Sequence, residues 1–341
     1  MKLLLSSILL SLSALAAPAA AQVLGFAWDN DLVTGTDGQY TNGSRLSWLG
    51  DAHPAACESC WAAQSGRLLA GLPGLTSAKE YFFGASLEQL MVTPSDITLA
   101  TPQYNDTPYA GLLRGELLLI GRRGKGMTGY GLTLGVTGEA SRAASSQRRV
   151  HRATGSTLPQ GWHTQLPQRT VFGVSAGHAR ELWRGQLGEW DVALTGAAAL
   201  QADHWLGQAS LGFYAGVGRS IPYNFLPMFG ATGSAAALSS VPGHQPPGWM
   251  LFLGTQSNAV GWSYLERESI RAGYRFRNED VIGAVNGGVA LQFQAWSLVF
   301  AFQRPTNYTD LGEAMSFGSI TLMRRFQGKA ASSQASVLSA R

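Results

Sequence analysis

Three clusters of polar residues in this 341-residue chain have types and spacings suited to hydrolytic chemistry. Carboxylate and amide oxygens are hard ligands that suit calcium. A histidine side chain exchanges protons near neutral pH and can therefore act as a general base. The clusters comprise Asp29, Asn30, Asp31, Gly38 and Thr41 in the first, residues 105–111 in the second, and Gln147, Arg148, Arg149, His151 and Arg152 in the third.

None of these clusters is specific when it is taken alone. A hairpin rich in Asn, Asp and Gly is an ordinary loop, and the spacing of Asp29 and Asp31 is weak evidence for calcium. A lone loop histidine is more often a bystander than a base. The arginines beside His151 would also suit the phosphates or anionic sugars of a membrane surface. Function therefore depends on which fold brings the clusters together.

Residues 1–21 have the features of a cleavable secretory signal peptide. The segment begins with one lysine, continues as an apolar run and ends in Ala19-Ala20-Ala21, which fits the small-residue cleavage pattern. The apolar run is too short for a transmembrane anchor and lacks a stop-transfer flank. We therefore expect an exported protein whose mature chain starts near Gln22.

The composition favours a membrane protein that crosses the bilayer with strands. Charged residues make up 13% of the chain and hydrophobic residues 45%, yet no mature stretch approaches the ~20 apolar residues that a spanning helix needs. Alternating strands then remain as the way to satisfy backbone groups in lipid. The net charge of +4 is small for this length, so nucleic acid is not an expected partner.

Segments of about ten residues alternate between apolar and polar side chains and are separated by turn residues. In one segment Val285, Val289 and Leu291 oppose Asn286 and Gln292, which is the lipid-out, lumen-in pattern. The sequence predicts an all-β fold, a 12-stranded antiparallel transmembrane β-barrel over residues 22–326, followed by a polar tail at 327–341. The strands are expected at 22–31, 40–50, 80–92, 109–121, 127–140, 168–182, 187–201, 209–219, 249–259, 281–293, 295–304 and 313–326.

The connections between these strands indicate which end of the barrel faces outward. With a periplasmic amino terminus, the turns on the inner side are short and the extracellular loops are long. Two periplasmic connections, 51–79 and 220–248, are longer and are interpreted as insertions below the barrel. The short turns are placed at 122–126, 183–186 and 294, and the long loops at 93–108, 141–167 and 260–280. This topology places all three polar clusters at the outer rim.

Cys57 and Cys60 are the only cysteines and are spaced C-x-x-C. A redox motif would need a βαβ pattern around the pair, and two cysteines without neighbouring ligands make a weak zinc site. Because an exported protein meets an oxidising compartment, a small structural disulfide is the favoured interpretation.

Read together, the motifs resemble the lipid A 3'-O-deacylases of Gram-negative outer membranes, an LpxR-like family. The resemblance covers nearly the whole mature chain and depends on several motifs in the same order. They are Asp29-Asn30-Asp31 with residues 36–48, Thr93-Pro94-Ser95-Asp96, residues 105–111, Gln147-x-x-x-His151-Arg152-x-x-Gly155, Gly161-Trp162-x-x-Gln165-Leu166, and 317–326.

The resemblance implies a calcium-dependent hydrolase that removes 3'-O-linked acyl chains from lipid A. His151 would be the general base that activates water, and the calcium ligands would be Asp31, Asn30 and Asp29. Backbone N–H groups near Gly38 would join calcium in stabilising the oxyanion. Thr41 would complete the polar wall. The remaining roles are substrate binding by Gln147, Arg148, Arg149 and Arg152, and support by Asp106 and Arg45.

The same resemblance implies the partners and the location. The substrate would be lipid A or lipopolysaccharide, the surroundings outer-membrane lipids, and the site would open at the extracellular face of a Gram-negative outer membrane. We expect a monomer. Two positions depart from the pattern: residues 93–108 contain no lysine, and Leu32 stands where some members carry an acidic residue.

Two alternatives remain open from the sequence. A channel or structural barrel could keep the rim residues without catalysis, because alternation does not distinguish a pore from a filled lumen. An outer-membrane phospholipase is the other, although Ser145 and Ser146 beside His151 match no recognisable nucleophile motif.

Overall fold

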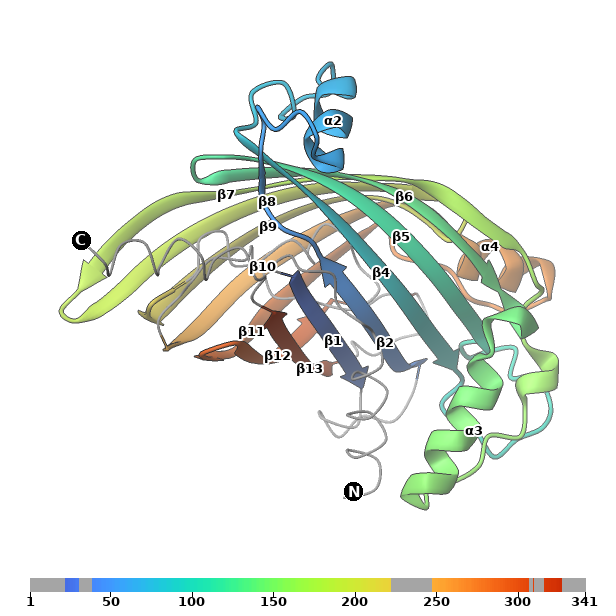
Figure 1. Ribbon diagram of the computed structural model, residues 1–341. Coiled ribbons are helices and arrows are strands. Elements are labelled where there is room, and N and C mark those ends of the chain that lie inside the picture. Colours follow the sequence, from blue (N-terminus) through green and yellow to red (C-terminus); the bar gives the residue numbers. More distant parts are fainter. Residues whose placement is uncertain (1–21, 31–38, 222–246, 307–308, 310–315, 327–341) are drawn as a thin grey trace, which may run out of the picture.

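The computed structural model describes residues 22–30, 39–221, 247–306, 309 and 316–326. In these residues, twelve long antiparallel strands form a closed barrel, as predicted (Figure 1). The barrel closes because β1 pairs with both β2 and β13, while β2 pairs with β4. The strands are β1 (Gln22–Asn30), β2 (Gln39–Leu49), β4 (Glu80–Thr93), β5 (Ala110–Arg123), β6 (Gly126–Thr137), β7 (Thr170–Leu187), β8 (Trp190–Asp203), β9 (Leu206–Arg219), β10 (Gly248–Ser263), β11 (Val281–Phe293), β12 (Trp296–Pro305) and β13 (Phe317–Phe326).

Side chains alternate across the wall of the barrel as the sequence predicted. On β12, Phe300 and Phe302 are exposed on the outer face, whereas Gln303 is buried on the inner face. On β11, Val285 is exposed and Asn286 is buried. An apolar outer face and a polar inner face are the arrangement of barrels that cross membranes.

In the described part of the chain, three short α-helices lie at the two ends of the barrel (Figure 1). Helices α3 (Ala143–Thr154) and α4 (Tyr264–Arg271) lie at the end where β4, β6 and β10 finish. Helix α2 (Trp61–Leu68) lies toward the opposite end, following the two-residue strand β3 (His53–Pro54), which pairs with the start of β4. Among the described residues, no helix is long and apolar enough to cross a membrane.

The turn after β7 and the histidine-bearing loop differ from their predictions. The turn expected at 183–186 is wrong, because β7 continues to Leu187 and turns at Gly188-Glu189. Gly188 has a φ of +63°, which glycine adopts without steric cost. The long loop expected at 141–167 contains α3, whose Ala, Gln and Arg residues are good helix formers.

A disulfide joins Cys57 and Cys60, with a Cα–Cα distance of 5.5 Å. The predicted disulfide between the two cysteines is therefore confirmed. It closes a turn that ends at the residue before α2.

A network of buried ion pairs occupies the lumen. Glu88 on β4 lies 2.9 Å from Arg45 on β2 and 2.5 Å from Arg114 on β5. Arg114 also lies 3.2 Å from Asp203, which belongs to β8. Because β5 and β8 are not neighbours in the sheet, the last pair crosses part of the lumen. The side chains therefore fill the lumen here and favour a packed barrel over an open channel.

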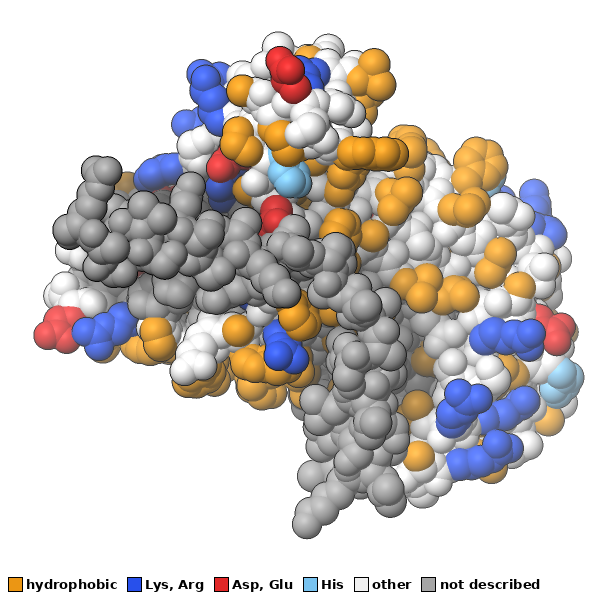
Figure 2. Space-filling model, viewed as in Figure 1, with side chains coloured by type: hydrophobic (Ala, Val, Ile, Leu, Met, Phe, Trp, Pro, Cys, Tyr) orange, Lys and Arg blue, Asp and Glu red, His pale blue; other side chains and the backbone are white. Residues whose placement is uncertain are grey.

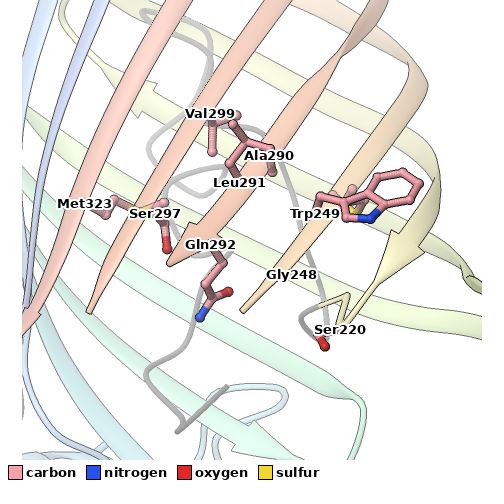
Figure 3. A pocket seen from close by; sticks show the side chains of 10 residues that line it. Ser220, Gly248, Trp249, Ala290, Leu291, Gln292, Ser297, Val299 and Met323 are labelled. Carbon is pink, nitrogen blue, oxygen red and sulfur yellow. The ribbon is translucent and has the colours of Figure 1, made fainter. Parts of the chain in front are cut away.

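A small cavity lies at the end of the barrel away from α3, between the starts of β10 and β12 and the end of β11 (Figure 3). Its volume is about 30 Å³, and Trp249, Met250, Leu291 and Val299 are among the residues that line it. This volume suits a water molecule. It is too small for an acyl chain, so the cavity is not the candidate site.

Candidate active site at the barrel rim

Helix α3 is fixed to the outer face of the barrel at its rim. The side-chain amide of Gln89 on β4 donates a 2.6 Å hydrogen bond to the backbone carbonyl of Ser141, just before the helix. Met91 on β4 packs in one buried cluster with Ala143 in the first turn of α3 and with Trp162. The start of the helix is therefore held at the end of β4.

Gln147 is buried beneath α3 and anchors the helix to the segment that follows it. Its Oε1 accepts a 2.6 Å hydrogen bond from the indole Nε1 of Trp162. Its Nε2 is also buried and has no hydrogen-bond partner among the described residues. An unsatisfied buried donor costs about 1–3 kcal/mol. The Nε2 group of Gln147 is therefore a buried donor without a partner among the described residues.

His151 lies four residues after Gln147, so the two side chains share one side of α3. Its Nδ1 lies 2.5 Å from the backbone carbonyl oxygen of Thr157. Because a carbonyl oxygen only accepts, Nδ1 must carry the proton and donate it. In the neutral ring, Nε2 then carries the lone pair. The half-buried imidazole is thus held in the tautomer that a general base at Nε2 requires.

The three predicted arginines lie on α3 beside the histidine. Arg148 is half-buried, and Arg149 and Arg152 are exposed. Figure 2 shows Lys and Arg side chains gathered over the region that α3 occupies in Figure 1. This surface has the charge needed to attract phosphate groups.

Two positions in the histidine motif require glycine, each for a different structural reason. Gly155 ends α3 with a φ of +75°, a left-handed conformation that glycine supplies at helix ends. Gly161 lies against Tyr109, and an added Cβ would come within 2.4 Å of that ring. The first glycine allows the chain to turn back toward His151, and the second allows residue 162 to reach Gln147.

Residues 94–109 form a scaffold that supports the histidine segment. Asp106 accepts hydrogen bonds from the backbone N–H groups of Ser95 and Thr107, at 2.9 and 2.6 Å. Hydrogen bonds from the hydroxyl and the backbone N–H of Thr98 hold the pKa of Asp96 below its ordinary value. Both carboxylates shape this loop, and the supporting role expected of Asp106 in the site stays a prediction.

The third long loop packs against the other two. Burial raises the pKa of Tyr264 to about 12, so its hydroxyl stays protonated and donates to the backbone carbonyl of Pro167. The ring of Tyr274 lies 5.2 Å from that of Tyr104 in the second loop. The backbone N–H of Arg275 donates to the carbonyl of Tyr104. The rim is therefore one connected structure.

The aspartate-asparagine hairpin reaches the same rim. Asn30 on β1 is paired with Asn42 on β2, and Asn42 is paired with Met91, whose side chain contacts the first turn of α3. Figure 1 shows the end of β1 and the start of β2 on the side of the barrel that carries α3. Asp31 and Gly38 lie outside the described residues, as do the side chains of Asn30 and Thr41.

Comparison with known proteins gives this arrangement a family. Residues 3–326 match the family described as "Outer membrane protein LpxR". The chain belongs to the LpxR family. It is therefore an outer-membrane protein. Membership of this family supports its assignment as a lipid A deacylase.

The solved structure of one LpxR family member has the fold described above. The structure of LpxR from Salmonella typhimurium matches with a TM-score of 0.71 at 14% identity, over 89% of this chain and 100% of that chain. The β domain of the Bordetella autotransporter BrkA matches with a TM-score of 0.39 at 10% identity, over 91% of this chain and 100% of the other. No curated protein matches the sequence.

The calcium ligands predicted for this LpxR family member are Asn30, Asp31 and Asp29, and only the last has a described side chain. Asp29 is buried toward the lumen, where Arg45 attracts it electrostatically. In the described part of the chain, no three His, Cys, Asp or Glu side chains are grouped as a metal site requires. The hairpin oxygens have the chemistry that calcium prefers. Since Asp29 already has a cationic neighbour, the fit depends on Asn30 and Asp31.

Two residues of the site were not predicted from the sequence. Thr157 orients His151 through its backbone carbonyl, so its side-chain type carries no signal for this role. Trp162 appeared only as part of a motif, yet its indole fixes Gln147. The sequence around Trp162 gives no indication that its indole contacts Gln147. Such contacts become visible only when the loop is folded.

Proposed function

We propose that this LpxR family member is a calcium-dependent hydrolase that removes 3'-O-linked acyl chains from lipid A. The reaction would take place in the outer leaflet, at the rim that carries α3. His151 is the general base in this proposal. The observation that carries it is the Nδ1 hydrogen bond to Thr157, which leaves Nε2 as the acceptor of a proton.

The proposed reaction is attack by water on an ester carbonyl. Nε2 of His151 takes a proton from water as the oxygen bonds to the acyl carbon. The tetrahedral intermediate then loses the sugar 3'-oxygen, which receives the proton from the imidazolium. The products are a free fatty acid and a sugar hydroxyl. Throughout, the carbonyl of Thr157 accepts from Nδ1 and stabilises the charged ring.

Substrate binding would use donors and cations close to His151. The buried Nε2 of Gln147 is available to donate to an ester or sugar oxygen. Arg148, Arg149 and Arg152 supply positive charge for the lipid A phosphates, a role for which arginine is well suited. These groups also take the place of the lysine that residues 93–108 lack.

Calcium would be held by the hairpin oxygens of Asn30 and Asp31. When bound, the ion would supply positive charge that stabilises the developing oxyanion. In the same proposal, N–H groups near Gly38 donate to that oxygen, and Thr41 contributes a hydroxyl to the site wall.

Lipid A mass spectrometry tests the proposed function directly. Cells that make lipid A with a 3'-acyloxyacyl group are compared with and without expression of this chain. The expected result is a loss of mass equal to the 3'-linked acyl chains, with phospholipids unchanged. Release of fatty acid from phospholipids alone would support a phospholipase. Unchanged lipids with ion conductance in planar bilayers would support a channel.

The donor of Gln147 is expected to contribute to catalysis. Replacing Gln147 with leucine should lower kcat/KM by about tenfold, because one hydrogen bond is worth about 0.5–1.5 kcal/mol. Trp162→Phe is the matched control, since it removes the partner of Oε1 and leaves the Nε2 donor in place. Steady-state kinetics on folded protein would separate the two. If both variants lost the same kcat/KM, Gln147 would be an anchor for α3 and not a substrate contact.

Removal of calcium is expected to stop the reaction. A chelator should abolish deacylation, and added calcium should restore it. Asp31→Asn should shift the calcium midpoint to higher concentration, because it removes one negative charge from a hard-ion site. The measurement is activity against free calcium for both proteins. Identical midpoints for the two proteins would remove Asp31 from the ligand set.

A further inference from the structure

Helix α2 presents two large apolar side chains to its surroundings. Trp61 is 79% exposed and Leu68 is 84% exposed. They are seven residues apart, or about two turns, so both project from one side of the helix. The opposite side, with Ala62, Ala63 and Gly66, is buried against the barrel. The exposed pair therefore points away from the barrel wall.

The α2 segment, defined here as residues 55–78, packs on the outer face of the wall and not beneath the barrel. It covers the outward-facing side chains of Tyr81 on β4, Leu119 on β5 and Tyr130 on β6. Two positions closer to the α3 end of the barrel, Leu117 on β5 is paired with Leu132 on β6. These two leucines are 64% and 65% exposed. Two strand residues span about 7 Å. The α2 segment thus borders the apolar belt, and Figure 1 shows α2 rising from the outer surface.

Elsewhere around this end of the barrel, tryptophans occupy the boundary of the apolar belt. Trp183 and Trp190 at the β7–β8 turn are exposed, as is Trp296 at the start of β12. Trp249 at the start of β10 lies 6.0 Å from Trp190 between ring centroids. Tryptophan and tyrosine gather at the depth of lipid headgroups in membrane proteins. These residues therefore mark where the membrane ends at this side.

Over β4, β5 and β6, the aromatic side chains at this boundary are withdrawn from lipid. Tyr81 is buried beneath the α2 segment, and the hydroxyl of Tyr130 donates to the carbonyl of Pro73 within it. The segment restores an aromatic side chain to the boundary by presenting Trp61. Figure 2 shows hydrophobic side chains both on the α2 region and on the adjoining wall.

We propose that the α2 segment is a membrane-interface anchor that places Trp61 and Leu68 in the phospholipid leaflet at the end of the barrel opposite α3. The Cys57–Cys60 disulfide closes the turn immediately before Trp61 and fixes the start of the helix. The guanidinium of Arg67 donates to the carbonyls of Ala55 and Cys57 and braces the same turn. The apolar surface of α2 is continuous with the belt that already faces lipid. This inference does not depend on the proposed catalytic activity.

Photo-crosslinking in vesicles tests the anchor. The full chain, folded into vesicles of phosphatidylethanolamine and phosphatidylglycerol, carries a photoreactive phenylalanine analogue at position 61 or 68. Position 117 in the belt is the lipid-exposed control, and position 58, an exposed glutamate of the same segment, is the water-exposed control. The expected result is phospholipid adducts at 61 and 68 that approach those at 117 and exceed those at 58 several-fold.

Two other outcomes would overturn the proposal. Adducts at 61 and 68 no more frequent than at 58 would place the helix in water. A covalent dimer formed from positions 61 and 68 would identify a second copy of the chain as the occupant. Heat-modifiable gel mobility verifies that each variant is folded, and the two side chains contribute little to packing. A failed anchor would leave lipid A deacylation unaffected, so the two proposals are tested separately.

Discussion

Replacing His151 with alanine is expected to lower the rate of lipid A deacylation by about 10²–10⁴-fold, the usual contribution of a general base. The imidazole is held in one tautomer by the carbonyl of Thr157, and that carbonyl gains no partner from alanine. The measurement is the fraction of 3'-deacylated lipid A in cells, followed by single-turnover kinetics on the purified protein. The barrel itself should stay folded, because His151 is only half-buried on a rim helix.

Two controls separate loss of the base from damage to α3. Arg149→Ala changes an exposed residue of the same helix and should keep the maximal rate, although KM can rise through weaker phosphate binding. His151→Gln retains a donor for Thr157 but provides no basic nitrogen. Its activity should be as low as that of His151→Ala. Wild-type turnover in either histidine variant would show that another group activates the water.

The fold could be predicted because successive side chains of a barrel strand face opposite sides of the wall, which gives the sequence a two-residue period. On β12, for example, Phe300 faces outward and Gln303 faces inward. Lipid outside the barrel favours apolar side chains, and the lumen accepts polar ones, so spanning strands share this alternation. The positions of the turns were harder to predict than the strands. A turn was predicted at 183–186, yet β7 continues through a register shift at Glu181 and Trp183, and the chain turns at Gly188. Local residue types do not show such a shift.

The site was predicted in part, and the limits have a physical cause. Motif residues such as His151 and Asp106 could be named as candidates because their chemistry depends on their side chains. The helix that carries the histidine was missed, because residues 143–154 lack a strongly apolar face and gain stability from contacts at one buried side. The contacts of Arg45 also could not be predicted. It was expected to support the hairpin, and the structure places it in the lumen, where it pairs with Glu88 and also attracts Asp29 of the hairpin.

The lumen network connects the stability of the barrel with the position of the rim. Arg45 and Glu88 join β2 to β4, and Arg114 extends the connection to Asp203. Asp203 in turn accepts backbone hydrogen bonds from Trp205 and Leu206 at the β8–β9 turn, which lies at the rim. Trp205 stacks on Tyr264 of the third loop. The charges of the lumen and the packed rim are thus one continuous set of contacts.

Glu88→Ala is expected to destabilise the barrel by about 3–5 kcal/mol, the cost of removing one partner from a buried ion pair. Glu88, Arg45 and Arg114 have side chains that are at most 6% exposed. Without the carboxylate, Arg45 and Arg114 would remain as two buried cations with less compensation. The measurement is urea-induced unfolding in detergent micelles, followed by tryptophan fluorescence. A lower midpoint with an unchanged slope would report lost stability.

Glu80→Ala provides the matched control, because it breaks an ion pair on the same strand. Glu80 lies 2.5 Å from Arg122, but their side chains are 35% and 30% exposed. Such a pair is worth only about 0–1 kcal/mol, since water solvates both partners after the break. The comparison therefore separates the effect of burial on stability from the effect of losing a salt bridge. Equal losses of stability in the two variants would mean that the lumen around Glu88 is as well hydrated as the barrel end, and the packed-lumen interpretation would then be wrong.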